Sequence, residues 1–101
     1  MPSNKQTLSE QDLHEVLRGM PEWGFEEGKL VRFYTFAEFV QAMAFVNQVA
    51  QLAEQAGHHP DIDIRYNTVK LALVSHDAGG ITALDAQMAQ QLNALPPSSC
   101  P

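Results

Sequence analysis

Three of the four histidines of this chain fall within one stretch, residues 54–85. His58 and His59 are adjacent, and His76 follows a pattern of strand, turn and strand. A hairpin would fold His76 back beside the His58–His59 pair, so that imidazoles distant in sequence would face one pocket. Because imidazole gives and takes protons near neutral pH, such a pocket would suit general acid–base chemistry.

Two other interpretations of these histidines stay open. The adjacent pair at a helix end can cap the last carbonyl groups and interact favourably with the helix dipole. Three imidazoles can also bind zinc, but the sequence has no His-Glu-x-x-His motif and no cysteine near them. Neighbouring residues on an extended backbone also point in different directions, which disfavours a shared metal. Since no serine or cysteine has the surroundings of a nucleophile, non-covalent proton transfer is favoured over acyl transfer.

Length and charge limit the class of protein. The chain has 101 residues, 45% of them hydrophobic, which predicts a single domain over 1–101 with flexible tails at 1–8 and 96–101. The net charge is −6 and Lys and Arg form no cluster, so direct nucleic-acid binding is not expected. Cys100 is the single cysteine, which excludes an internal disulfide. Without an apolar run of membrane-helix or signal-peptide type, we expect a cytoplasmic protein that does not bind membranes.

Helical spacing of apolar residues predicts three helices that must position these side chains. The first follows Ser9 and the third follows Thr82, each of which is a helix-capping residue type. The longest covers 37–56, with an expected apolar face made of Phe36, Phe39, Val40, Met43, Val46, Val49, Ala50, Ala53 and Ala56. Gly57 is expected to end this helix in the left-handed conformation, which delivers the adjacent histidines directly after it.

Alternating apolar residues predict two β-hairpins, one over 22–36 and one over 61–76. In the first hairpin we expect the face that carries Val31 and Phe33 to be the buried one. The order of elements is then α-β-β-α-β-β-α. It predicts an α+β fold in which three helices pack on one face of a four-stranded antiparallel sheet.

The spacing of the chemically capable residues resembles the signature of a known family. The succession is Glu54, three residues, His58-His59-Pro60, five residues, Tyr66, nine residues, His76, eight residues, Asp85. It resembles the signature of the pterin-4a-carbinolamine dehydratases, and the likeness extends from about Trp23 to Leu92.

The resemblance implies conversion of 4a-hydroxytetrahydropterin to quinonoid dihydropterin and water, in tetrahydrobiopterin recycling, with neither a metal nor an organic cofactor. It implies His58, His59 and His76 as the catalytic set. His58 and His76 would be the acid–base pair, while His59 would mainly hold the pterin. Glu54 would support an imidazole, whereas Asp85 is left out of the catalytic set because a first-turn helix carboxylate explains it. The substrate-binding residues it implies are Gly57, His58, His59, Ser75, His76 and Asp77.

The resemblance also has implications for partners. It implies a homo-oligomer, either a dimer or a tetramer, in which sheet edges pair across subunits. Some members of the family bind other proteins, including a transcription factor in animals and carboxysome assembly partners in bacteria. A non-catalytic binding, assembly or coactivator module is therefore the alternative function. The intact set of histidines favours the enzyme, since a scaffold has no need of it.

Overall fold

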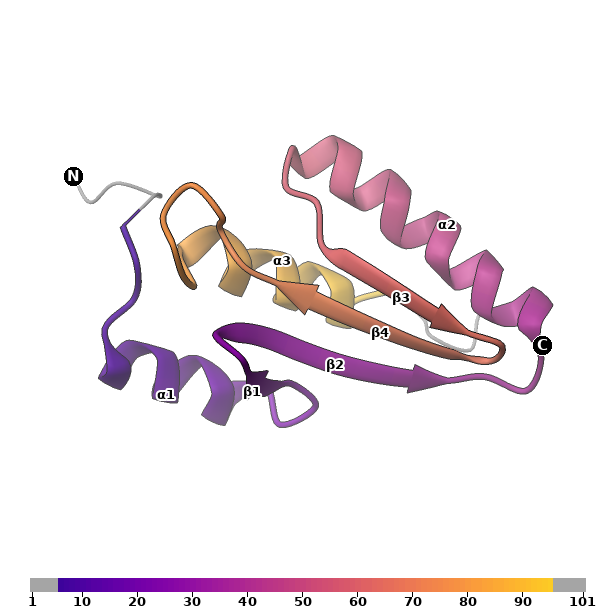
Figure 1. Ribbon diagram of the computed structural model, residues 1–101, viewed down its shortest axis with the longest axis horizontal. Coiled ribbons are helices and arrows are strands. Elements are labelled where there is room, and N and C mark those ends of the chain that lie inside the picture. The colour runs from indigo at the N-terminus through magenta and orange to yellow at the C-terminus, as the bar shows by residue number, and fades with distance from the viewer. Residues whose placement is uncertain (1–5, 96–101) are drawn as a thin grey trace.

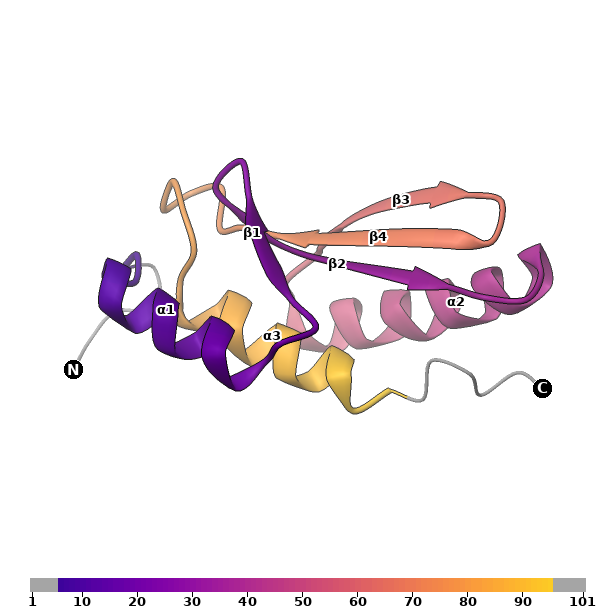
Figure 2. The same cartoon turned by 90° about the horizontal axis from the view of Figure 1, so that it is seen from below.

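A computed structural model describes residues 6–95 of the chain (Figure 1). In chain order its elements are α1 (Glu10–Gly19), β1 (Gly24–Glu26), β2 (Lys29–Thr35), α2 (Phe39–Ala56), β3 (Asp61–Arg65), β4 (Thr68–Leu73) and α3 (Ala83–Asn93). The strands form one antiparallel sheet in the order β1-β2-β4-β3. All three helices lie on the same side of this sheet (Figure 2). The predicted α+β fold and its order of elements are confirmed.

The central strand β4 forms the floor of the core. Val69, Leu71 and Leu73 are fully buried beneath the helices and share one cluster with Phe45 of α2. Side chains of a strand alternate between its two faces, so Lys70 points to the face that the described helices leave open. The core therefore lies between β4 and the helices. No described helix covers the opposite face of the sheet, although Val31 and Ala72 on that face are buried.

For β2, the prediction of the buried face is wrong. Phe33 is 56% exposed, and it stands opposite Lys70 on the open face, although Val31 on the same face is covered. Tyr34 is buried instead, with its ring centre 4.4 Å from that of Phe45. Both faces of this strand carry large apolar side chains, so alternation alone does not tell which of them the helices cover.

The buried face of α2 is narrower than the predicted apolar face and is rotated from it. Phe39 is 47% exposed and Val40 is 71% exposed, so the first turn of the helix projects beyond the core. The side chains that are buried recur at helical spacing: Ala42, Phe45, Val46, Val49 and Ala53. Two small residues in this set allow the helix to lie close to the sheet.

Helices α1 and α3 begin with the expected caps, Ser9 and Thr82. The hydroxyl of Ser9 accepts a hydrogen bond from the amide of Asp12 at 3.1 Å, and that of Thr82 accepts one from the amide of Leu84 at 3.2 Å. These bonds satisfy amide groups that have no partner within the first turn of a helix. None of the helices in the described part of the chain is long and apolar enough to cross a membrane.

The N-terminal segment is paired before α1 begins. The amide of Leu8 donates to the carbonyl of Ile81 at 2.8 Å, and Thr7 forms an isolated antiparallel bridge with Thr82. Part of the segment expected to be a loose tail is therefore attached to the fold. The rest of that tail, residues 1–5, and the other expected tail, 96–101, lie outside the described residues.

Candidate active site

A pocket opens at one end of the sheet, where the end of α2, the segment after β4 and the start of α3 converge. Its lining consists of Gly57, His58, His59, Val74, Ser75, His76, Asp77 and Leu84. The predicted hairpin thus brings His76 to the same pocket as the adjacent histidines. Of the residues expected at the site from the sequence, Glu54 alone is not part of the lining.

The end of α2 places the adjacent histidines. Gly57 has a φ of 67°, in the left-handed region where a residue without Cβ is favoured, as predicted. The amides of Gly57 and His58 both donate hydrogen bonds to the carbonyl of Ala53, and the bond from His58 is 3.2 Å long. This double closure ends the helix sharply. Pro60 then prevents any continuation of the helix, so the histidines occupy a short and constrained junction.

A tight turn after β4 places His76. The amide of Ser75 donates to the carbonyl of Gly80 at 3.0 Å, and the amides of Ala78 and Gly79 donate back to the carbonyl of Ser75 at 3.0 and 2.9 Å. Gly79 has a φ of 78°, which the turn requires. The ring of His76 is exposed at the pocket, and it has no hydrogen-bond partner within residues 6–95.

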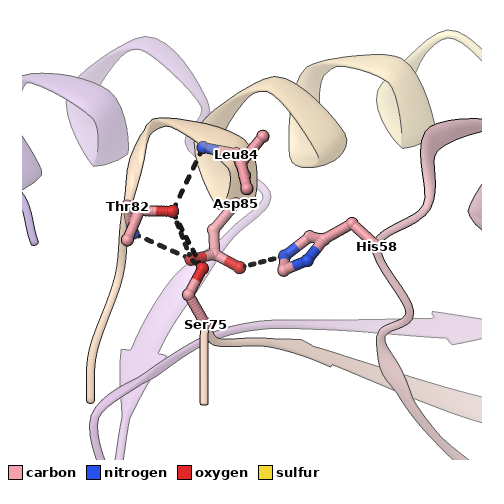
Figure 3. Close-up of polar contacts among 5 residues, drawn as sticks. All are labelled: His58, Ser75, Thr82, Leu84 and Asp85. Carbon is pink, nitrogen blue, oxygen red and sulfur yellow. Dashed lines mark hydrogen bonds and ion pairs between the residues drawn. The ribbon is translucent and has the colours of Figure 1, made fainter. Parts of the chain in front are cut away.

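His58 is held by a buried carboxylate (Figure 3). Its Nε2 lies 2.5 Å from Oδ1 of Asp85, which is fully buried, and only 15% of the His58 side chain is exposed. The other carboxylate oxygen accepts hydrogen bonds from the amide of Thr82 and from the hydroxyl of Ser75, both at 2.8 Å. Every oxygen of this buried group is therefore paired, which is the condition for burying it.

This contact is the feature that the sequence interpretation missed. Asp85 forms a capping box with Thr82, in agreement with the first-turn helix role that the sequence predicts for this carboxylate. One oxygen serves the cap while the other is bonded to His58, so the residue belongs to both the helix and the site. The signal was present in the signature spacing, which already included Asp85.

His59 has a carboxylate partner of its own. Its Nε2 lies 2.6 Å from Oε2 of Glu54, one turn back on α2, and both side chains are largely exposed, at 62% and 79%. The imidazole that Glu54 contacts is thus that of His59 and not that of His58. Because solvent screens exposed pairs, the contact orients the ring and contributes little to stability.

The arrangement favours proton transfer at two rings. If Nε2–H of His58 donates to Asp85, its Nδ1 is left to exchange a proton, since the bond made by one ring nitrogen sets the state of the other. His76 presents an unpartnered ring to the same pocket. Among residues 6–95, no three histidine, cysteine, aspartate or glutamate side chains are grouped so as to hold a metal ion.

Comparison with known proteins gives consistent matches along this part of the chain. The family model described as "Pterin 4 alpha carbinolamine dehydratase" matches residues 6–95. A protein of Acidobacterium capsulatum named "Putative pterin-4-alpha-carbinolamine dehydratase" is 52% identical over 88 residues, which are 87% of this chain and 96% of that protein. The matched range includes the three pocket histidines and Asp85.

Two solved structures share the fold. A Brucella melitensis protein described as a transcriptional coactivator/pterin dehydratase has a TM-score of 0.82 and 35% identity, covering 88% of this chain and 97% of that one. A pterin dehydratase-like protein described as a RuBisCO assembly factor of the alpha-carboxysome has a TM-score of 0.58 and 23% identity, covering 71% and 83%. The second likeness concerns the fold alone.

Proposed function

The chain belongs to the pterin 4 alpha carbinolamine dehydratase family, and we propose that it converts a 4a-hydroxytetrahydropterin to quinonoid dihydropterin and water, in tetrahydrobiopterin recycling. The observation that carries this proposal is the meeting of His76 and the Asp85-bound His58 at one pocket. Two imidazoles that line one cavity suit a reaction in which one proton is given and another is taken.

The proposed reaction uses the two rings together. One imidazolium donates a proton to the hydroxyl oxygen at C4a, so that the C–O bond breaks and water leaves. The other imidazole takes the proton from N5, whose electron pair forms the new double bond to C4a. His58, through Nδ1, and His76 are the pair, and either can be the acid. Each ring recovers its starting state by exchange with solvent, which reaches the exposed His76.

We assign Asp85 as a positioning residue for His58. A carboxylate at Nε2 fixes which ring nitrogen carries the proton. Ser75 lines the pocket, but its hydroxyl is engaged by Thr82 and Asp85 at 2.8 Å. Its side chain therefore supports the carboxylate, and any contact with the pterin comes from its backbone.

We assign the remaining pocket residues to binding. His59, oriented by Glu54, holds the pterin, and the backbone of Gly57 and the side chain of Asp77 lie beside it in the lining. Because His59 is exposed, it can reach the substrate without breaking a buried contact. The proposed set needs neither a metal nor an organic cofactor.

The test is the decay of 4a-hydroxytetrahydropterin followed by stopped-flow absorbance, with protein treated with a chelator. We expect acceleration that chelator does not affect, and loss of about 100-fold or more in His76→Ala, which removes one proton-transfer group. Decay at the uncatalysed rate with wild-type protein would exclude the dehydratase. Activity that chelator abolishes and zinc restores would replace proton transfer by metal catalysis.

A binding role is the second candidate, favoured by the similar Brucella protein, whose description combines a coactivator with a pterin dehydratase. We propose a cytoplasmic homo-oligomer, a dimer or tetramer, in either case. A variant with His58, His59 and His76 all replaced by alanine separates the candidates. A binding module would keep its protein partner in a pull-down, whereas an enzyme would lose turnover.

A further inference from the structure

The segment before α1 lies against the segment that links the His76 turn to α3. Both are at the same end of the molecule, beyond the end of β4 (Figure 1). Leu8 donates its amide to the carbonyl of Ile81 at 2.8 Å, and Thr7 forms an antiparallel bridge with Thr82. Ile81 is 6% exposed and Thr82 is fully buried. The N-terminal segment thus pairs, through an isolated β-bridge, with a buried part of the chain next to the site.

The turn that carries His76 places few steric restraints on its own backbone. It contains two consecutive glycines, one of them with a positive φ, and glycine restricts the backbone less than any other residue. The amides of Ala78, Gly79 and Gly80 all point to one carbonyl, that of Ser75. These bonds close the turn on itself, whereas the bond from Leu8 attaches the end of the turn to another part of the chain.

The contact between the two segments is close. A Cβ placed on Gly80 would lie 3.1 Å from Cγ2 of Thr7 and 3.9 Å from its Cβ. The shorter distance is below ordinary van der Waals contact, so the methyl group of Thr7 occupies the space beside the glycine. The side chain of Thr7 therefore touches the turn itself.

We propose that Thr7 and Leu8 are positioning residues, which hold the Ile81–Thr82 segment and thereby fix His76 relative to His58. Thr82 makes the connection, because its amide and hydroxyl bind Asp85 and Ser75. Displacement of this segment moves the turn that carries His76 together with the Asp85 carboxylate that binds His58. For catalysis the inference rests on the proposed function, but the attachment of the turn is a property of the fold.

The test is a double-variant cycle in the full chain. Gly80→Ala sets a methyl group against Thr7, and we expect kcat to fall about 10-fold or more, since small misplacements of reacting groups are costly. KM should change less, because the displaced side chains are those proposed to transfer protons and not those proposed to hold the pterin. Adding Thr7→Ser removes Cγ2 and should restore most of the activity. Gly19→Ala is the matched control, since a Cβ there meets nothing within 4 Å.

Amide hydrogen exchange gives a readout that needs no turnover. We expect the amide of Leu8 to exchange faster in Gly80→Ala than in wild type, and to regain its protection in the Thr7→Ser/Gly80→Ala protein. Unchanged exchange and turnover in Gly80→Ala, or losses that Thr7→Ser does not relieve, would overturn the inference. If wild type has no dehydratase activity, the proposed function fails, and the exchange data alone decide whether these residues hold the turn.

Discussion

Asp85 is the residue at which helix capping and proposed chemistry meet. Its carboxylate caps the first turn of α3 through Thr82 and binds His58 at 2.5 Å. The two roles use different oxygens, so neither interferes with the other. The backbone at the start of α3 fixes the position of the Asp85 carboxylate, and this carboxylate in turn orients the imidazole of His58.

Asp85→Asn tests the positioning role. The amide keeps the shape of the side chain but can present an NH₂ group to His58, which would favour the other tautomer. We expect kcat/KM to fall about 10-fold to 100-fold, with an altered pH–rate profile, because general acid–base catalysis depends on protonation state. The control is Asp12→Asn, an exposed carboxylate in the first turn of α1. An unchanged pH–rate profile and kcat, whatever the loss of stability, would reduce Asp85 to a cap.

Tyr34 gives a prediction about stability at alkaline pH. Burial raises its pKa above the ordinary value of 10.0, and the nearby Glu22 adds to this while Arg32 opposes it. The folded state then keeps the phenol proton at a pH where the unfolded chain loses it. Stability from this residue is complete below about pH 10 and is lost as pH rises above that value.

The variant that tests this is Tyr34→Phe. The buried hydroxyl has no hydrogen-bond partner among residues 6–95, so its removal should change the free energy of unfolding at pH 7 by less than about 1 kcal/mol. It should also weaken the alkaline loss of stability in urea titrations, whereas Tyr66→Phe, in an exposed turn, should not. A decrease of well over about 1 kcal/mol in the free energy of unfolding of Tyr34→Phe at neutral pH would mean that the hydroxyl has a hydrogen-bond partner.

At the scale of elements, the order of helices and hairpins followed from periodicity and turn residues, but their orientation did not. Phe33 and Val40 are apolar and exposed, and nothing in their own segments distinguishes them from buried neighbours. Which face of β2 or α2 is covered depends on the packing of distant elements. Gly57, in contrast, was predictable, because a helix followed by glycine and then His-His-Pro has a local reason to stop.

Gly57→Ala tests that helix end. A Cβ at this position meets no atom within 4 Å, so the cost comes from the left-handed backbone alone, roughly 1–2 kcal/mol in the free energy of unfolding. Gly57→Asn should cost less, because asparagine tolerates this conformation better. Urea unfolding of both variants, with Gly19→Ala as control, measures the difference. Equal stability of the alanine variant and wild type would contradict the strained conformation.

At the scale of the whole molecule, the pocket gathers residues from the end of α2, the turn after β4 and the start of α3. The sequence indicated that a hairpin would bring His76 back to His58, and the fold agrees. The sequence did not reveal the contact between Asp85 and His58 or the hydrogen bond from Leu8 to Ile81. Both contacts join segments whose distance in space depends on the complete fold.

The outer edge of the sheet bears on the proposed oligomer. β3 is an edge strand, and Ile62 on it is 37% exposed. Unprotected edges favour pairing with another strand. We expect light scattering to give the mass of a dimer or tetramer, and Ile62→Lys to lower it. Phe33→Lys, on a strand inside the sheet, should leave the mass unchanged. A mass of 11.2 kDa for wild type would contradict the proposal.

The most direct test of the account is the rate constant for dehydration of 4a-hydroxytetrahydropterin by wild type and by the His58→Ala/His76→Ala double variant. We predict that wild type accelerates the reaction by at least about 100-fold and that the folded double variant leaves it near the uncatalysed rate. Equal rate constants for the two proteins would contradict the assignment of these histidines as the proton-transfer pair.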